Sequence, residues 1–338
     1  MPAPIPAVPP VVSIILATYN WTSVLRLAIR SVLAQSFRDF ELLVVGDCCT
    51  DDTEEVVASF GDPRIRWHNL PKNSGNQAGP NNAGLAMAKG EFTAYMHQDD
   101  LWFPDHLEVL VPAMRKGVAP LAHTLALDVS PPPEHLRRIV GLPSRGAFGA
   151  DRREIWTITL MHRTQHARSL GAWRDWRELR QVPVMDFIHR VIGPEHRFTT
   201  VNAITAVKFH SAQRLRSYVE KPCYEQASYL EQMERDAPGL RYRELVAVAD
   251  CVARGKYERR TIAQTPKDAP PGWEIEQLNK ARGLLAGEPE PVVSTSGSRH
   301  NPALLWALLR RMRRLIPRAL RGRAGIVLQR AGSWLDRD

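Results

Sequence analysis

Cysteine is scarce in this chain and forms no recognisable site. The four cysteines among its 338 residues (Cys48, Cys49, Cys223 and Cys251) show no metal-ligand spacing, and the adjacent pair is a poor disulfide candidate. This usage is typical of a protein in a reducing, cytoplasmic setting.

Long apolar runs are also missing. The start MPAPIPAVPP has neither the basic residues nor the apolar run of a secretory signal peptide. Residues 11–16 form an apolar run of strand length, well short of the roughly 20 residues that span a membrane. We therefore expect no signal peptide and no transmembrane segment.

Positive charge is in excess, but it is unevenly spread. Residues 301–338 hold nine Arg and two Asp, which account for +7 of the net +9 and leave +2 on the first 300 residues. A nearly neutral body argues against nucleic-acid binding. With 44% apolar and 24% charged residues, most of the chain should fold around a core.

The hydrophobic period changes regularly along the first third of the chain. We predict strands at 11–17, 40–45, 64–69 and 91–96, and helices at 22–33, 52–60, 83–88 and 104–115. Strands that alternate with helices indicate a parallel sheet with right-handed crossovers. Further along, we expect a strand at 155–161, a helix starting at 184–191, helical structure over 218–260, and linkers at 265–272 and 286–302.

Three predicted strands end in distinctive polar groups, at residues 18–20, 46–47 and 97–100. Ligands of an open parallel sheet bind at the carboxyl ends of its strands. An aromatic residue, a carboxylate and an acidic pair there could serve a base, a ribose and a metal-bound diphosphate. Each group alone is more often a cap or a turn than part of a site. No Gly-rich phosphate loop follows the first strand, which disfavours the Walker and dinucleotide-binding folds.

Several segments between Val12 and Trp102 carry a family pattern. They are VSIILATYN (12–20), SVLAQSFRDFELLVVGD (31–47), TDDT (50–53), NAGLAMAKGEF (82–92) and the pair Asp99-Asp100 followed by LW. Their order and spacing resemble glycosyltransferase family 2, nucleotide-sugar-dependent enzymes of the GT-A fold. A weaker match over 162–176 and 184–186 resembles the family's acceptor-side segment. The resemblance implies an α/β GT-A type, Rossmann-like, mostly parallel sheet flanked by helices, here with a C-terminal helical extension.

The resemblance also implies roles for single residues. Thr18 and Tyr19 would contact the nucleotide base, Tyr19 by stacking, and Asp47 would hydrogen-bond the base. Asp99 would ligate Mn²⁺ or Mg²⁺ as the last residue of a DxD-like motif, with Asp100 shaping the donor-sugar site. Asp186 would be the general base. The implied nucleotide-sugar-binding set is completed by Asn20, Asn82 and His97.

The chain departs from the family pattern at several of these positions. Gly46 replaces the first acid of the paired-acid turn, and Cys48-Cys49 replace the usual Gly-Ser. His97 replaces the first Asp of the DxD-like motif, where it could bond a ribose, approach the metal or be a buried structural histidine. Asn81 stands at a position that is often basic.

These observations favour an inverting glycosyltransferase. It would transfer a sugar from a nucleoside diphosphate to a hydroxyl of a glycan or lipid-linked glycan, with a divalent cation neutralising the leaving diphosphate. Asp186 would activate the acceptor, unless it merely starts its helix or Asp175 or Glu178 is the base. The alternatives are a nucleotidyltransferase and a non-catalytic nucleotide-sugar or polyanion-binding module.

The basic tail is predicted to be an amphipathic helix. At 100° per residue, its apolar residues fall within one arc of about 140°, and four arginines lie on the opposite side. The apolar residues are Leu304, Leu305, Leu308, Leu309, Met312, Leu315 and Ile316. We expect residues 303–323 to lie on an anionic membrane surface, at the inner face of the cytoplasmic membrane. The alternative is docking on the catalytic domain or on a partner protein.

The expected organisation therefore has five parts. They are a Pro-rich leader (1–10), a GT-A domain (11–215), a helical extension (216–285), a linker (286–302) and the basic amphipathic tail (303–338).

Overall fold

The computed structural model describes residues 9–132, 135–141, 155–195, 197–254, 266 and 268–289. Its strands are β1 (Val12–Thr18), β2 (Phe40–Gly46), β3 (Ile65–Asn69), β4 (Phe92–His97), β5 (Leu101–Trp102), β6 (Leu121–Val129), β7 (Arg137–Val140), β8 (Leu160–Arg163) and β9 (Thr199–Phe209). Its α-helices are α1 (Thr22–Leu33), α2 (Thr53–Ala58), α3 (Ala78–Met87), α4 (His106–Lys116), α5 (Thr164–Ser169), α6 (Pro183–Ile192), α7 (Ser217–Glu220), α8 (Tyr224–Ala253) and α9 (Trp273–Arg282).

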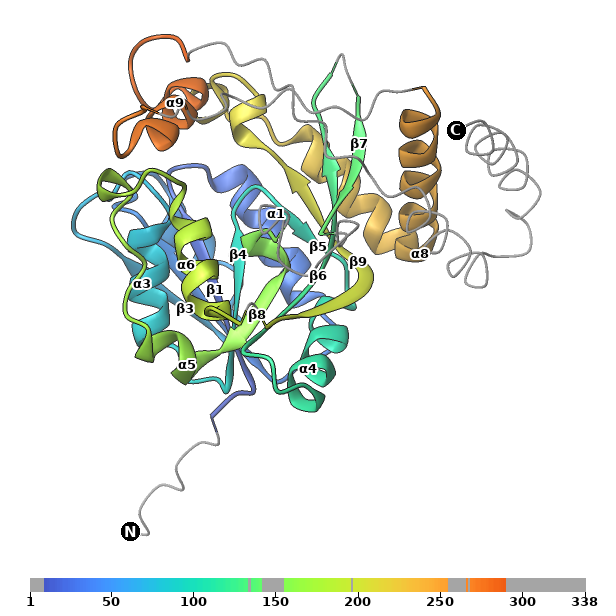
Figure 1. Cartoon of the computed structure of the whole chain (residues 1–338). Coiled ribbons are helices and arrows are strands. Elements are labelled where there is room, and N and C mark those ends of the chain that lie inside the picture. The colour runs from blue at the N-terminus through green and yellow to red at the C-terminus, as the bar shows by residue number, and fades with distance from the viewer. Residues whose placement is uncertain are drawn as a thin grey trace.

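All the described strands join one sheet, in the order β3-β2-β1-β4-β8-β6-β9-β5, with β7 paired to β6 (Figure 1). β1 lies at the centre of a parallel half and pairs with β2 and β4. β8 runs antiparallel to β4 and joins this half to the long parallel pair β6–β9. The four strands predicted in the first 96 residues and their parallel pairing are confirmed.

Helices cover both faces of the parallel half because its strands are apolar on both sides. Ile14 and Ile15 are neighbours in β1 and therefore point to opposite faces, and both are fully buried. Ile14 belongs to the core formed with α1 and α4, whereas Ile15 belongs to the core formed with α3 and α6. The helical stripe predicted for residues 22–33 is the buried face of α1.

The second half differs more from prediction. β6 and β9 were not expected, and the predicted strand at 155–161 begins as a 3-10 turn at Thr157–Thr159 before β8 starts at Leu160. The helical stretch expected over 218–260 is divided into α7 and α8. α8 bends at Asp236, whose backbone is non-helical, two residues before Pro238. Proline lacks the backbone N–H that a continuous helix needs, which explains the bend.

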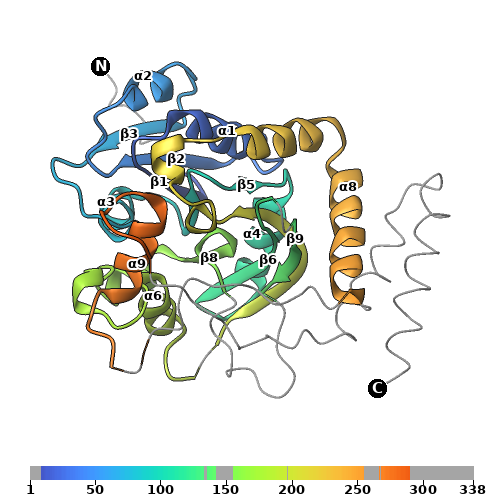
Figure 2. The ribbon, with the colours of Figure 1, turned by 90° about the horizontal axis from the view of Figure 1, so that it is seen from above.

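The helices α8 and α9 lie at different parts of the sheet. Figure 2 shows α8 along one side and α9 above α3, beside the carboxyl ends of the parallel strands. α8 covers a separate core formed with β6 and β9, which includes Leu125, Phe209 and Leu230. By their residue numbers, α8 and α9 lie within residues 216–285, the stretch predicted as a helical extension.

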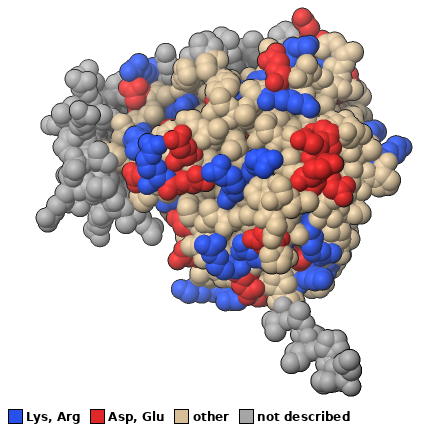
Figure 3. Space-filling view, turned by 180° about the vertical axis from the view of Figure 1, so that it is seen from behind, with Lys and Arg blue, Asp and Glu red and all other residues tan. Residues whose placement is uncertain are grey.

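Charge on the described surface is mixed. On the face in Figure 3, Lys and Arg side chains are interspersed with Asp and Glu. No helix of the described part of the chain is long and apolar enough to cross a membrane. The amphipathic tail (303–338), most of the 286–302 linker and the first eight residues of the leader lie outside the described residues.

Candidate functional site

The three predicted polar groups meet at one edge of the sheet. In the parallel register, Thr18 of β1 lies opposite Gly46 of β2, and Ala17 lies opposite His97 of β4. The residues that follow these strands therefore share the carboxyl edge. This is where an open α/β sheet binds its ligands.

Gln98 ties the ends of β1 and β4 together. Its Oε1 accepts hydrogen bonds from the Thr18 hydroxyl at 2.5 Å and from the Tyr19 backbone N–H at 2.8 Å. Its Nε2 donates to the Tyr218 hydroxyl at 3.0 Å. Tyr218 comes from α7, and its ring stacks on Tyr19 with centroids 6.4 Å apart. Tyr19 is thus positioned by two residues, Gln98 and Tyr218, to which the sequence analysis gave no role.

Asn20 supports the turn after β2. Its backbone is left-handed (φ 42°), a conformation that asparagine tolerates. Its Oδ1 accepts a hydrogen bond from the Thr50 N–H at 2.8 Å, and its Nδ2 donates to the Thr50 hydroxyl at 3.3 Å. The structure therefore gives the Asn20 amide a role in shaping the wall of the site.

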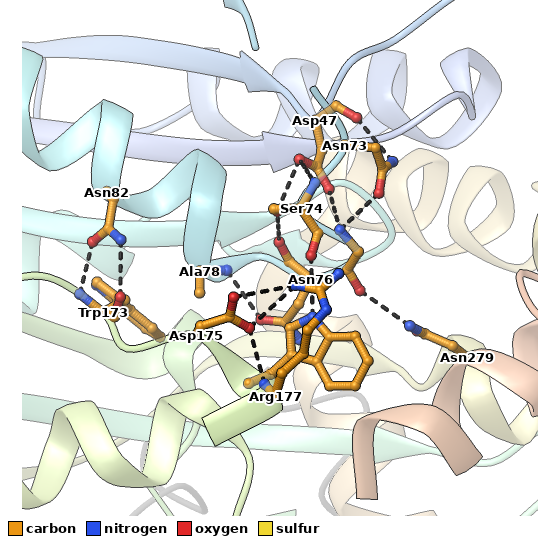
Figure 4. Close-up of polar contacts among 12 residues, drawn as sticks. Asp47, Asn73, Ser74, Asn76, Ala78, Asn82, Trp173, Asp175, Arg177 and Asn279 are labelled. Carbon is orange, nitrogen blue, oxygen red and sulfur yellow. Dashed lines mark hydrogen bonds and ion pairs between the residues drawn. The ribbon is translucent and has the colours of Figure 1, made fainter. Parts of the chain in front are cut away.

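Asp47 holds the loop between β3 and α3 (Figure 4). Its Oδ1 accepts hydrogen bonds from the Ser74 N–H and hydroxyl, both at 2.8 Å, and its Oδ2 accepts one from the Gly75 N–H at 3.2 Å. Burial raises the pKa of Asp47, although these hydrogen bonds and Arg177 act in the opposite direction. The carboxylate predicted to bind a base also fixes the loop that lies beside it.

The same loop is held from two further segments. The Trp176 indole N–H donates to the Ser74 carbonyl at 3.1 Å, and the Asn279 amide of α9 donates to the Gly75 carbonyl at 3.0 Å. α9 therefore forms part of the rim of the site, a contribution that no local pattern of residues 268–289 indicated.

Gly46 leaves no space for the acid that the family pattern has at this position. A Cβ atom at Gly46 would lie 2.5 Å from Trp67 and 2.6 Å from the Oδ1 of Asn69. Asn69 in turn accepts a hydrogen bond from the Cys49 N–H at 2.8 Å. The Trp67 indole and the Asn69 amide thus occupy the space that an acidic side chain at position 46 would need. Cys49 packs beside them as a small residue, and burial raises the pKa of its thiol.

His97, Asp99 and Asp100 form a compact cluster, with potential ligand atoms within 4.8 Å of one another. Asp99 is buried, and its carboxylate forms no hydrogen bond or ion pair with any described residue; only its backbone carbonyl has a partner, the Gln226 amide of α8 at 3.3 Å. An unpartnered buried carboxylate is costly, and its oxygens are the ligands that Mg²⁺ and Mn²⁺ prefer. The donor set at Asp99 therefore fits a divalent cation.

Both carboxylate oxygens of Asp100 already have protein partners. Its Oδ2 lies 2.7 Å from the Lys208 Nζ and 3.0 Å from the His97 Nδ1, and its Oδ1 accepts from the Phe209 N–H at 2.9 Å. Burial alone would raise the pKa of Asp100, but the charge of Lys208 and the contacts with His97 outweigh it, so this pKa is lowered. His97 turns its Nδ1 toward this pair, while its Nε2 is buried without a partner among the described residues.

Asn82 fastens α3 to the segment before α6. Its Oδ1 accepts a hydrogen bond from the Trp173 N–H at 2.7 Å, and its Nδ2 donates one to the Trp173 carbonyl at 2.9 Å (Figure 4). Both the oxygen and the nitrogen of the side-chain amide therefore have a partner. Trp173 then stacks on Phe187 of α6 at 4.2 Å. Asn82 thus positions the segment that the resemblance assigns to the acceptor side.

Asp186 lies in the first turn of α6 and is held by two arginines. Its Oδ1 accepts from Arg174 at 3.1 Å, and its Oδ2 from Arg190 at 2.9 Å. The Arg190 guanidinium also donates to the carbonyls of residues 170–172. Arg174 is 57% exposed but Arg190 only 17%, so the partner of Oδ1 is the more exposed of the two arginines. Among the described residues, no hydrogen bond or ion pair joins Asp186 to the His97 cluster.

The competing carboxylates occupy the turn before α6. Asp175 accepts a hydrogen bond from the Arg177 N–H at 2.9 Å and pairs with the same guanidinium at 3.2 Å, in an exposed position. Glu178 lies in the 3-10 turn Trp176–Glu178 that follows.

Comparisons with known proteins agree with this architecture. Residues 13–169 match the model of glycosyl transferase family 2. An uncharacterized glycosyltransferase of Rickettsia typhi is 35% identical over 107 residues, which are 32% of this chain and 33% of that protein. The succinoglycan biosynthesis protein ExoO of Rhizobium meliloti is 38% identical over 30% of this chain and 29% of its own.

A further relative matches a similar length of this chain. The UDP-Glc:alpha-D-GlcNAc-diphosphoundecaprenol beta-1,3-glucosyltransferase WfgD of Escherichia coli is 37% identical over 31% of this chain and 42% of its own. The match spans about a third of the length of the first curated relatives.

Solved structures extend the likeness in fold alone. TarS 1–349 of S. aureus has a TM-score of 0.50 and 17% identity, and the likeness covers 95% of this chain and 87% of that one. The fold is thus of the GT-A type, with a mostly parallel sheet flanked by helices. Residues 13–169 of this chain are thus similar to glycosyl transferase family 2, and the likeness of the rest of the chain to solved structures is one of fold alone.

Proposed function

We propose that this chain is an inverting glycosyltransferase that moves a sugar from a nucleoside-diphosphate sugar to a hydroxyl of a glycan or lipid-linked glycan. One observation carries the proposal. Asp99 presents a buried carboxylate without a protein partner at the sheet edge where Thr18, Tyr19 and Asp47 also gather. A carboxylate that fits a cation, beside the polar edge of the sheet, suits a diphosphate-linked donor better than a purely structural cluster.

Asp99 would hold the cation, Mn²⁺ or Mg²⁺, with donor phosphate oxygens completing its coordination. When bound, the cation would neutralise negative charge on the leaving diphosphate. Tyr19 would present its ring to the base, held in place by Gln98 and Tyr218. The loop fixed by Asp47 would close the base side of the donor site.

Asp186 is proposed as the general base. Because Arg190 holds Oδ2 from a half-buried position, proton transfer would use Oδ1, after the acceptor displaces the exposed guanidinium of Arg174. If Asp186 instead stays paired with both Arg174 and Arg190 when the acceptor binds, its role is only to anchor residues 170–172 through Arg190. The two roles predict different variants and are compared in the Discussion.

The donor and acceptor classes take support from the named relatives. The name of WfgD specifies UDP-Glc and a diphosphoundecaprenol-linked acceptor, and ExoO is named as a succinoglycan biosynthesis protein. UDP is therefore the first nucleotide to test. A lipid-linked acceptor would also suit the predicted amphipathic tail, which would hold the active site at the membrane surface.

The test is a thermal-shift screen of nucleoside diphosphates and their sugars, with and without Mn²⁺, followed by transfer assays. A bound nucleotide stabilises the fold by RT ln(1 + [L]/Kd), so the correct one should stand out. We expect Asp99→Asn to lose metal-dependent binding and turnover while its Tm stays unchanged or rises, because a buried unpaired charge is removed. Asp250→Asn, which changes an exposed carboxylate of α8, is the matched control.

The outcomes separate the three functions. Release of pyrophosphate would indicate a nucleotidyltransferase, and binding without transfer or hydrolysis would indicate a non-catalytic module. Full turnover by Asp99→Asn would exclude the metal role of that residue. Inversion is read directly from the anomeric configuration of the product.

Membrane attachment has its own test. Full-length protein and a chain ending at Ser298 are sedimented with anionic and with neutral vesicles. We expect only the full-length protein to follow the anionic vesicles. Equal binding by the shorter chain, or none by the longer one, would exclude the tail as the anchor.

A further inference from the structure

A lysine is built into the acidic cluster. Lys208, one residue before the end of β9, places its Nζ 2.7 Å from Asp100 Oδ2 and 3.3 Å from His97 Nδ1. The lysine side chain is 11% exposed and that of Asp100 is fully buried. Burial removes water from an ammonium at a large cost in free energy unless an anionic partner compensates for it. The contacts with Asp100 and His97 therefore hold Lys208 in place. The strand pairing of β9 with β6 sets its position, since Lys208 lies opposite Asp128.

This contact changes what the acidic cluster can bind. Both oxygens of Asp100 have protein partners, because the Phe209 N–H takes Oδ1 and Lys208 takes Oδ2. A divalent ion coordinated by Asp100 Oδ2 would lie beside the Lys208 ammonium. The two positive charges would repel each other strongly in a partly buried site. Of the two carboxylates in the cluster, Asp99 is the one without a protein partner among the described residues and is therefore the more open to a cation.

Lys208 also has a donor to spare. An ammonium has three N–H groups, and the described residues supply it with at most two acceptors, Asp100 and His97. The Nζ atom lies beside Asp100, the residue that follows Asp99 at the sheet edge where the donor diphosphate would bind. Phosphate oxygens are suitable acceptors for such a group.

We propose that Lys208 is a resident cation of the donor site, which binds the diphosphate directly and makes nucleotide binding partly independent of a divalent metal. This inference rests on the proposed function. During transfer, the acceptor oxygen would bond to the anomeric carbon while the bond from that carbon to the diphosphate oxygen breaks. The electron pair leaves with the diphosphate, the acceptor proton goes to the base, and Lys208 stabilises the departing charge without losing a proton.

The first measurement is UDP affinity by calorimetry, in EDTA and in saturating Mn²⁺. We expect the unaltered protein to bind UDP in both buffers. Lys208→Met should weaken binding in EDTA by roughly tenfold or more, the usual effect of losing a hydrogen bond to a charged group. The loss in Mn²⁺ should be smaller, because the ion then supplies the positive charge. Lys116→Met, at the exposed end of α4, should change neither value.

The second measurement is the affinity for Mn²⁺ alone, followed by the spin resonance of the free ion. Lys208→Met frees Asp100 to act as a second ligand, so it should bind Mn²⁺ more tightly than the unaltered protein. Because Asp100 would then be a buried unpaired charge, we add the double variant Lys208→Met/Asp100→Asn, which removes both charges. It should bind Mn²⁺ no more tightly than the unaltered protein and still bind UDP weakly in EDTA.

Three results would overturn the inference. They are equal loss of UDP affinity in both buffers, unaltered EDTA affinity in the double variant, and unchanged Mn²⁺ affinity in Lys208→Met. Failure of every variant and of the unaltered protein to bind UDP in either buffer would instead count against the proposed function. The Mn²⁺ titration would still decide the role of Lys208 in that case.

Discussion

The carboxylate of Asp47 accepts two hydrogen bonds from Ser74, one from its backbone N–H and one from its hydroxyl, both at 2.8 Å. Residues 27 positions apart are thereby joined at the edge of the site. We expect Asp47→Ala to lower the free energy of unfolding by about 1–3 kcal/mol, since it leaves the Ser74 and Gly75 N–H groups without their acceptor. Nucleotide affinity should fall as well.

Urea unfolding and amide hydrogen exchange at Ser74 and Gly75 check this expectation. The control is Glu231→Ala, which removes an exposed carboxylate paired with Arg235 on α8 and should cost less than about 1 kcal/mol. Unchanged exchange at Ser74 in Asp47→Ala would mean that the loop is held from elsewhere.

Gly46 and Trp67 fill one space between them. We expect Gly46→Ala to destabilise the protein by about 1–3 kcal/mol, because the added carbon would lie 2.5 Å from the indole. In a Trp67→Leu background the cost should fall, though not to zero, since Asn69 lies 2.6 Å from the same point. A double-mutant cycle measures the difference. Equal cost in both backgrounds would show that the indole yields without strain.

The parallel half of the sheet could be predicted because its signals are local. Residues 22–33 were expected to be helical and form α1 with the same bounds, since one apolar stripe decides both ends. β6 was missed because buried polar residues interrupt its apolar pattern. His123 and Thr124 are buried within it, bonded to Thr200 and Thr205 of β9, and such pairs of distant residues leave no trace in periodicity.

The candidate site follows the same division. Tyr19, Asp47 and Asp99 were identifiable because each follows a predicted strand. Their partners were not, because Tyr218 lies 120 residues from Gln98 and Lys208 lies 108 residues from Asp100. Which lysine meets which carboxylate depends on how β9 is registered in the sheet, and that register involves the whole chain.

Asp186 can be tested as base against anchor. If it is the base, Asp186→Asn should keep the affinity for the nucleotide sugar and lose transfer, because a base acts on the acceptor. Arg174→Ala should then retain transfer, since it uncovers Oδ1 while Arg190 still orients the carboxylate. Donor affinity is measured by calorimetry and transfer by product formation.

The anchor role predicts a different pattern for the same variants. Asp186→Asn would then lower stability and affect donor binding and transfer together, as would Arg190→Met. The matched variants Asp175→Asn and Glu178→Gln test the neighbouring carboxylates. If one of them keeps donor affinity but loses transfer while Asp186→Asn stays active, that residue is the base and Asp186 is not.

Buried histidines should make the fold sensitive to mild acid. Burial lowers the pKa of His106 to about 3 from an ordinary 6.5, and its Nδ1 hydrogen-bonds Thr205 at 2.7 Å. Below pH 6.5 the unfolded chain therefore takes up a proton that the folded protein does not. The free energy of unfolding should fall as the pH drops from about 6.5 toward 3, by about 1.4 kcal/mol per pH unit for this residue.

The slope isolates this effect from any change in packing. We expect His106→Gln to be less stable at pH 7, because the ring also stacks on Trp102 at 4.1 Å, yet to lose stability more gradually between pH 6 and 4.5. His68→Gln, which alters an exposed imidazole on β3, should keep the slope of the unaltered protein. Urea unfolding at a series of pH values gives all three slopes. An unchanged slope in His106→Gln would mean that His106 takes up its proton in the folded protein, which would require its contacts with Trp102 and Thr205 to open in mild acid.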